Sequence, residues 1–266
     1  MISFVLIALS FLCVTFGQPS GYSLSCILTS VAAFGLFFRT ICSFSTKNRF
    51  LTGFAFFFCV QAVQLFWFTF HPFLYIWGVY LLLCLLIGLQ FGLLSLAASK
   101  RILSSRFSWL LLPALWVMME WSRLFWLSGF CFNFVGLSAT DNIFTLQMAS
   151  LGGMLGLTFW VMLTNTTFSR LLLLKTKSSL FLFCSTAIIP YLFGIAHLNI
   201  HTKEMLQYDK DHPPLTSLIV HQRVLPAVSV GERSDPIKKA FHQWQEIITA
   251  IGPHRKEKID LLLTPE

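Results

Sequence analysis

Three charged side chains lie where this sequence could carry out chemistry: Glu266 at the end of a strand-like segment, and Glu120 and Arg123 inside an apolar one. Glu266 closes the segment Lys258–Glu266, whose three consecutive leucines are typical of a short buried strand. Parallel α/β sheets present reactive groups beyond the carboxyl ends of such strands, so Glu266 is a candidate catalytic carboxylate. No lysine or cysteine follows it, and we expect the other members of a catalytic set to lie outside this chain.

Glu120 and Arg123 lie near the end of the apolar segment Phe107–Leu127. Their spacing places both side chains on one face of a helix, within reach of each other. An ionisable group inside a membrane costs about 2.5–3.5 kcal/mol on insertion scales, so such groups usually pair or line a cavity. Two interpretations stay open: an ion pair that anchors the helix end at the membrane interface, and a contact to a lipid headgroup or substrate at the outer surface.

The composition is that of an integral membrane protein. Hydrophobic residues make up 56% of the chain, charged residues only 11%, and the mean hydropathy is +0.72; soluble domains carry about 25% charged residues. The formal net charge of +8 comes from basic residues scattered over short connections, so we expect no nucleic-acid partner. The cysteines and histidines show no metal-ligand spacing, and we expect no disulfide framework, metal or cofactor.

Seven apolar segments are predicted to cross the membrane, which requires about 20 residues per helix. The first lacks the basic start and the cleavage site of a signal peptide, so we expect it to be retained. The predicted spans are Ile2–Phe16, Ser23–Phe38, Phe50–Phe70, Tyr75–Ala97, Phe107–Leu127, Phe144–Phe168 and Ser179–Ala196.

Basic residues alternate between the connections that join these spans. The second, fourth and sixth connections hold three basic residues each, whereas the first and third hold none. Because short cytoplasmic loops collect lysine and arginine, the N-terminus is predicted to be cytoplasmic, and seven crossings then place residues after about 197 outside. The basic residues are Arg39, Lys47, Arg49, Lys100, Arg101, Arg106, Arg170, Lys175 and Lys177.

The order of motifs along the chain resembles bacterial apolipoprotein N-acyltransferases. The segment Leu112–Arg123 contains a proline-alanine-leucine-tryptophan run followed by the glutamate, Leu127–Phe134 is a glycine-phenylalanine aromatic loop, and Leu151–Trp160 is a glycine-rich helix start. In that family the loop more often reads glycine-phenylalanine-proline-tryptophan, and here Cys131 and Phe132 occupy the last two places.

The resemblance continues beyond the last span. Leu215–Gln222 is similar to the opening strand of the family's nitrilase-type domain, a member of the carbon-nitrogen hydrolase superfamily. Pro236–Ile251 is predicted to form a helix, because its apolar residues recur every three or four positions. We therefore predict a transmembrane helical domain at residues 1–197, followed at residues 198–266 by the first strand, helix and strand of an α/β nitrilase-type domain. The resemblance spans nearly the whole chain but only about half of a typical family member.

The resemblance implies an acyltransferase of the bacterial inner membrane. Glu266 would be the general base of a glutamate–lysine–cysteine triad, and Glu120, Arg123 and Phe132 would contact substrate. The acyl donor would be a membrane phospholipid and the acceptor a diacylglyceryl-lipoprotein. Since the lysine and cysteine are missing, we expect the chain to be inactive alone, and a separately encoded C-terminal half could complete it.

Two alternatives stand beside this hypothesis. One is a small polytopic transporter in which Glu120 and Arg123 act as gating or ion-coupling groups. The other is a noncatalytic membrane scaffold. The transporter is disfavoured because intramembrane charges are few and no internal repeat is visible.

Overall fold

The computed structural model describes residues 2–19, 22–126, 129–211, 216–220, 236–254 and 259–263. The chain forms two units, one made of Met1–Thr69 with Tyr75–Ile200 and the other of Phe70–Leu74 with His201–Glu266. We call the first unit the helical body. It contains the segments predicted to cross the membrane, and the second unit contains the described strands.

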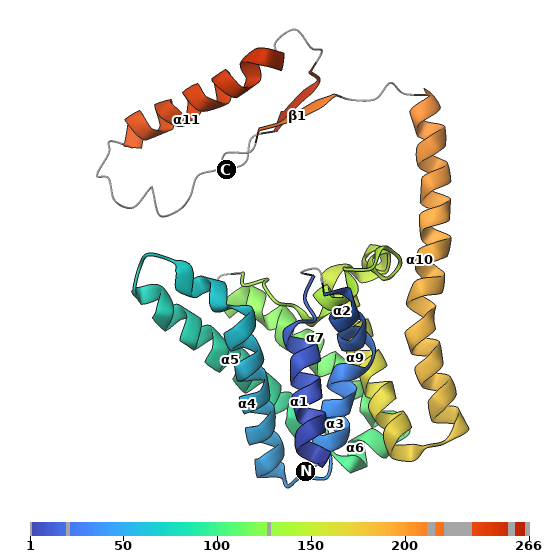
Figure 1. Cartoon of the computed structure of the whole chain (residues 1–266). Coiled ribbons are helices and arrows are strands. Elements are labelled where there is room, and N and C mark those ends of the chain that lie inside the picture. The colour runs from blue at the N-terminus through green and yellow to red at the C-terminus, as the bar shows by residue number, and fades with distance from the viewer. Residues whose placement is uncertain are drawn as a thin grey trace. The chain divides into compact units, whose positions relative to one another are not determined.

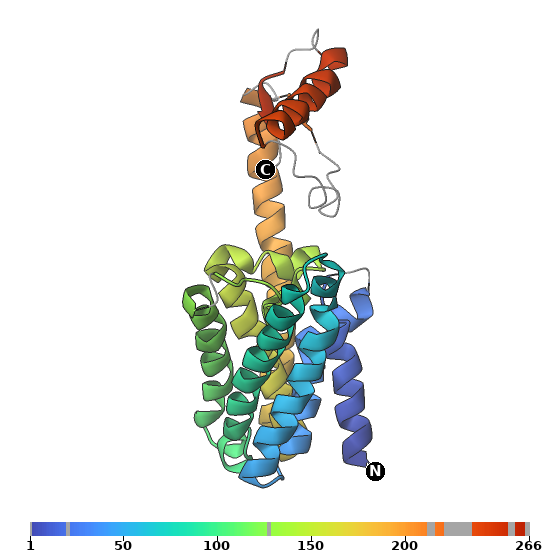
Figure 2. The same cartoon turned by 90° about the vertical axis from the view of Figure 1, so that its left-hand side faces the viewer.

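The helical body consists of helices joined by short connections (Figures 1 and 2). One of them, α10, begins in the helical body and extends into the second unit. The α-helices are α1 (Ile2–Thr15), α2 (Ser23–Leu28), α3 (Phe34–Ile41), α4 (Thr46–Gln64), α5 (Tyr75–Ala97), α6 (Lys100–Ser104), α7 (Leu111–Trp126), α8 (Ile143–Leu146), α9 (Ala149–Leu174) and α10 (Lys177–Asp211). A π-helical turn, η1 (Thr29–Ala33), links α2 to α3, and 3₁₀ turns occur at η2 (Phe66–Phe70), η3 (Ser108–Leu110) and η4 (Val135–Ala139).

Within the described residues, four helices are long and apolar enough to cross a membrane. The chain is therefore a membrane protein with several apolar helices, although the predicted count of seven spans is not reproduced by length and composition. A helix does lie in each predicted segment, but α1, α4 and α7 fall outside the set of four. The four are Ser23–Ile41, Tyr75–Ala97, Ala149–Leu174 and Lys177–Tyr208.

Two of the predicted spans are shifted or shortened for local reasons. Helix α4 begins at Thr46, because the hydroxyl of Ser45 accepts a hydrogen bond from the amide of Asn48 and caps it. It thus includes polar and basic residues that the hydropathy pattern left out. Helix α7 has only 16 residues, since the 3₁₀ turn η3 occupies the beginning of the predicted span. At 1.5 Å per residue it is about 24 Å long, less than the hydrocarbon thickness of about 30 Å.

Aromatic rings fill the core of the helical body. Phe91 of α5 lies 4.5 Å from Phe57 of α4 and 5.5 Å from Phe37 of α3, measured between ring centroids. Trp116 of α7 contacts the same cluster edge-on, 5.4 Å from Phe91. All four side chains are buried. The cluster therefore fixes α7 against α3, α4 and α5, and with it the charged residues that α7 carries.

The second unit contains two short parallel strands, β1 (Ser217–Ile219) and β2 (Leu261–Leu263). Leu218 pairs with Leu262, so the two predicted strand segments are in register. Helix α11 (Pro236–Ile251) lies between the strands in sequence and has the predicted bounds. This strand–helix–strand order is the α/β arrangement that the sequence predicts, without a further strand in the described residues.

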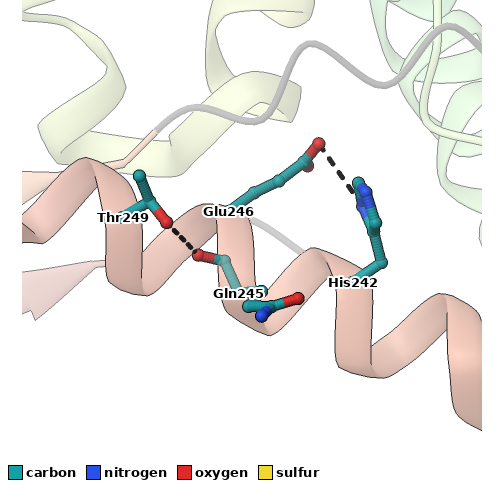
Figure 3. A network of polar contacts seen from close by, with 4 residues as sticks. All are labelled: His242, Gln245, Glu246 and Thr249. Carbon is teal, nitrogen blue, oxygen red and sulfur yellow. Dashed lines mark hydrogen bonds and ion pairs between the residues drawn. The ribbon is translucent and has the colours of Figure 1, made fainter.

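Helix α11 carries a polar face and an exposed apolar face. On the polar face, His242 Nδ1 lies 3.5 Å from Glu246 Oε1, and the Thr249 hydroxyl donates to the Gln245 carbonyl at 2.7 Å (Figure 3). An exposed pair of this kind contributes little stability. The apolar face has the predicted spacing, and its described members Phe241, Trp244 and Ile248 are 69%, 59% and 64% exposed.

Candidate functional site

Helix α7 places Glu120 and Arg123 in the interior of the helical body, where both side chains are fully buried. Trp116, one turn earlier, contacts both of them. Its indole N–H donates to Glu120 Oε1 at 2.9 Å, and the guanidinium carbon of Arg123 lies 5.1 Å from the ring centroid. The indole thus serves as a donor to the acid and as a cation–π partner of the base.

The Glu120 carboxylate joins three elements. Besides the Trp116 bond, Oε1 accepts a hydrogen bond from the amide of Val135 in η4 at 2.8 Å, and Oε2 accepts one from the hydroxyl of Thr158 in α9 at 2.5 Å. Glu120 and Arg123 do not form an ion pair, although their spacing would allow one. All three hydrogen bonds come from neutral donors, and together they link η4 to α7 and α9.

A second bond between η4 and α9 explains the glycine at position 136. The Gly136 amide donates to the Thr158 hydroxyl at 3.0 Å, so Thr158 bridges Glu120 and the η4 backbone. A Cβ at this position would lie 2.6 Å from the Thr158 amide nitrogen, which is too close for any side chain. Glycine is therefore needed for η4 to approach α9.

Arg123 differs from Glu120 in having unused donors. Its Nε donates to Oε1 of Gln90 in α5 at 2.7 Å, and Gln90 in turn donates to the Met119 carbonyl at 3.1 Å. Among the described residues, neither Nη1 nor Nη2 of Arg123 has a hydrogen-bond partner. A buried guanidinium without acceptors is costly, so these N–H groups are suited to an anionic or strongly accepting ligand.

Phe132 lies in the loop between α7 and η4 and is half exposed. Its ring centroid is 5.7 Å from that of Trp67 in η2 and 5.5 Å from that of Phe130. The next residue, Asn133, has a left-handed φ of 56° and donates to Gln61 Oε1 in α4 at 3.2 Å. These contacts hold the loop against η2 and α4, and the exposed Phe132 ring lies beside the aromatic residues of η2.

The structure brings three of the four predicted site residues into one region. Glu120 and Arg123 share Trp116, and Phe132 belongs to the loop that leads to Val135. The fourth, Glu266, lies outside the described residues. Among the described residues no group of three or more histidine, cysteine, aspartate or glutamate side chains could hold a metal ion.

Gln90 and Thr158 are the site residues that the sequence analysis did not single out. Gln90 is the only carboxamide in the span Tyr75–Ala97, which is a visible signal, because a lone amide in an apolar span needs a partner. Thr158 lies in the glycine-rich helix start, but its bond to Glu120 joins positions 38 apart and follows from no local pattern.

Comparison with known proteins identifies the family of this chain. Residues 4–167 match the family model described as the apolipoprotein N-acyltransferase N-terminal domain. Curated relatives named apolipoprotein N-acyltransferase come from Chlamydia pneumoniae, 26% identical over 97% of this chain and 47% of the relative, and from Chlamydia trachomatis serovar D, 23% identical over 98% and 47%. A third, from Chlamydia muridarum, is 28% identical over 72% of the chain and 37% of the relative. The chain spans about half the length of the first two relatives.

Proposed function

Because the chain belongs to the apolipoprotein N-acyltransferase family, we propose that it takes part in the N-acylation of bacterial lipoproteins. In this reaction a cysteine thiolate attacks an acyl ester of a membrane phospholipid, forming a thioester and releasing a lysophospholipid. The free α-amine of a diacylglyceryl-cysteine then attacks the thioester, forms an amide and releases the thiol. The family match does not favour the transporter alternative.

Glu266 is the proposed general base for both steps. What supports this is its position in the sequence, three residues after β2, where a parallel strand presents reactive groups at its carboxyl end. The lysine and cysteine of the triad would come from residues that correspond to the other half of the relatives, either on a separate polypeptide or on the same one. The apolar face of α11 would be covered by that other half.

The proposed location is the bacterial inner membrane, with seven crossings and a cytoplasmic N-terminus. The hydrogen bonds between the basic connections support this orientation. Arg39 Nε donates to the Leu172 carbonyl at 3.5 Å, and Arg170 donates to the carbonyls of Leu103 and Ser105. The three basic connections therefore meet at one end of the helical body, as the positive-inside rule requires of cytoplasmic loops. Residues after about 197 would then be extracytoplasmic.

Arg123 is the proposed contact for the phosphate of the lipid substrate, and its two Nη groups, which have no hydrogen-bond partner in the described part of the chain, carry this assignment. A planar guanidinium can donate two parallel hydrogen bonds to a phosphate. Helix α7 starts beside the basic connections and places Arg123 about 18 Å along the helix, toward the other membrane face. Glu120 would hold the loop, and Phe132 would contact acyl chains.

Substitution of Arg123 tests the phosphate contact. Wild-type chain purified in detergent should retain phosphatidylglycerol in preference to diacylglycerol, which has no phosphate. Arg123→Gln should lose about tenfold in that preference, the effect of removing a charge-assisted hydrogen bond, and Arg123→Lys should lose less. The matched control is Arg106→Gln, an exposed arginine in the basic connection that precedes η3 and α7. Equal retention by wild type and Arg123→Gln would rule out the contact.

A reconstitution experiment tests the acyl transfer. The 266-residue chain is incubated with phospholipid and a diacylated lipopeptide, with and without a polypeptide that corresponds to the second half of the relatives. Thioester and N-acylated peptide are expected only when both polypeptides are present, and Glu266→Gln should abolish them. Transfer by the chain alone, or undiminished transfer by Glu266→Gln, would contradict the proposal.

A further inference from the structure

Two neighbouring cavities open at the end of the helical body that carries η4. One is polar, with a volume of about 100 Å³, and the other is a narrower apolar crevice. They share the lining residues Ser30, Thr145 and Tyr191, so the polar cavity and the apolar crevice adjoin each other. An amphiphile, which has a polar end and an apolar end, would match the two cavities.

Asp141 gives the polar part its charge. The sequence up to residue 200 contains only two acids, Glu120 and Asp141, and all the hydrogen bonds of Glu120 are made with neighbouring elements. Asp141 lines the polar cavity, and among the described residues its carboxylate has no hydrogen-bond or ion-pair partner. The cavity therefore presents an uncompensated negative charge in a protein whose net charge is +8.

The hydroxyl groups around Asp141 add hydrogen-bond acceptors to the cavity. Three of the lining hydroxyls lie within hydrogen-bond distance of backbone carbonyls, and Ser30 Oγ also lies 3.0 Å from Ser138 Oγ. Each hydroxyl oxygen carries two lone pairs that can accept further hydrogen bonds. A cation with several N–H groups would therefore find acceptors beside the Asp141 carboxylate, whose negative charge disfavours an anion. The three bonds are Ser30 Oγ to the Cys26 carbonyl at 2.8 Å, Ser138 Oγ to the Val135 carbonyl at 2.9 Å and Thr145 Oγ1 to the Ala139 carbonyl at 2.5 Å.

We propose that this space is a binding site for a primary ammonium group carried by an amphiphile, with Asp141 as the counter-ion. The ammonium lies in the polar cavity, where it donates to the Asp141 carboxylate and to the lining hydroxyl oxygens. The adjoining methylene groups follow the apolar crevice, whose lining residues include Leu157, Trp160 and Pro190. A metal ion fits less well, since one carboxylate is the only charged ligand on offer.

Two sources share this chemistry: an ethanolamine phospholipid headgroup, and the free α-amine of a lipopeptide. The site rests on the membrane placement proposed above but not on acyl transfer. It is also independent of Arg123, which would contact a phosphate irrespective of the headgroup amine. Binding measurements can therefore support the Asp141 site and contradict the Arg123 contact, or the reverse.

The test measures lipids bound to the purified full chain by native mass spectrometry, with phospholipids of identical acyl chains. Phosphatidylethanolamine should be retained about tenfold more than phosphatidylcholine, whose quaternary nitrogen has no N–H donor. Asp141→Asn, which keeps the size of the side chain, should remove this preference without changing retention of phosphatidylglycerol. Asp141→Glu should preserve part of it. A parallel arm compares a diacylated lipopeptide with its N-acetylated form.

The outcomes separate the sources. Asp141-dependent retention of phosphatidylethanolamine identifies the phospholipid, the same dependence for the free-amine lipopeptide identifies the peptide, and both together identify a shared site. If neither ligand depends on Asp141 in a variant that elutes and melts like wild type, the proposal is wrong. Ala187→Phe, which fills the crevice, should weaken retention, whereas Leu192→Phe on the exposed face of α10 should not. Equal effects of these two variants would also overturn it.

Discussion

The backbone amide of Gly35 donates a hydrogen bond to Oδ1 of Asn165 at 2.9 Å, although 130 positions separate the two residues. The Asn165 amide group donates in turn to the carbonyls of Thr29 and Ser30, at 2.8 and 3.1 Å, in the π-helical turn η1. A π-turn disturbs the regular ladder of hydrogen bonds, and the freed groups cannot be satisfied by water inside an apolar body. Asn165 supplies the missing partners from α9.

Asn165→Ala should therefore destabilise the helical body by about 1–3 kcal/mol, the cost of leaving buried backbone groups unsatisfied. Thermal unfolding in detergent measures the effect. Ser150→Ala, an exposed position in the first turn of α9, before the kink at Gly152 and Gly153, is the control and should change the stability by less than about 0.5 kcal/mol. If both variants unfold at the wild-type temperature, the carboxamide is not what holds η1.

Glu120→Gln tests the role of the buried acid. The amide keeps the size of the side chain but loses the charge, and an NH2 donor replaces one of the two carboxylate oxygens. This donor faces either the Thr158 hydroxyl or the N–H groups of Val135 and Trp116, so the bonds on that side should weaken, with a loss of about 1.5–3 kcal/mol. Hydrogen exchange of the Val135 and Gly136 amides should accelerate by about tenfold or more. An acid that only contacts substrate would leave this exchange unchanged.

Gly136→Ala tests the close approach of η4 to α9. The added methyl group would meet the backbone of Thr158, which cannot move without bending α9. Overpacking of this kind costs about 1–3 kcal/mol. Gly156→Ala is the matched control, because no atom lies within 4 Å of its ideal Cβ, and removing a helical glycine should stabilise α9 by up to about 1 kcal/mol. Opposite signs in thermal unfolding are expected, and equal signs would contradict the contact.

The sequence predicts those elements best whose boundaries are marked locally. Helix α5 has the predicted bounds, because its apolar run ends shortly before Lys100, and α11 begins at Pro236 and ends before Gly252 as its terminal residues indicate. Helix α7 is shorter than predicted, since hydropathy does not distinguish the 3₁₀ turn η3 from the helix that follows it. The π-turn η1 depends on a residue of α9 and has no local signal.

The candidate site was only partly visible in the sequence for the same reason. Helical spacing correctly indicates that Glu120 and Arg123 share a side of α7, because both contact Trp116. It does not show that Glu120 bonds to neutral donors instead of Arg123. Those donors, Val135 and Thr158, lie 15 and 38 positions away, and only the tertiary packing of η4 and α9 brings them to the carboxylate.

Cys131 offers a test of the proposed orientation, because this cysteine is exposed in the loop next to Phe132. If that loop faces the extracytoplasmic side, a membrane-impermeant maleimide should label Cys131 in intact cells. Cys131→Ala should remove most of the label, since the remaining exposed cysteine, Cys59, lies within α4. Adding Ser104→Cys to Cys131→Ala creates a thiol at the end with the basic connections, and it should react only after the membrane is permeabilised. Labelling of Ser104→Cys in intact cells, with Cys131 protected, would reverse the orientation and remove the argument that places Arg123 at the outer face.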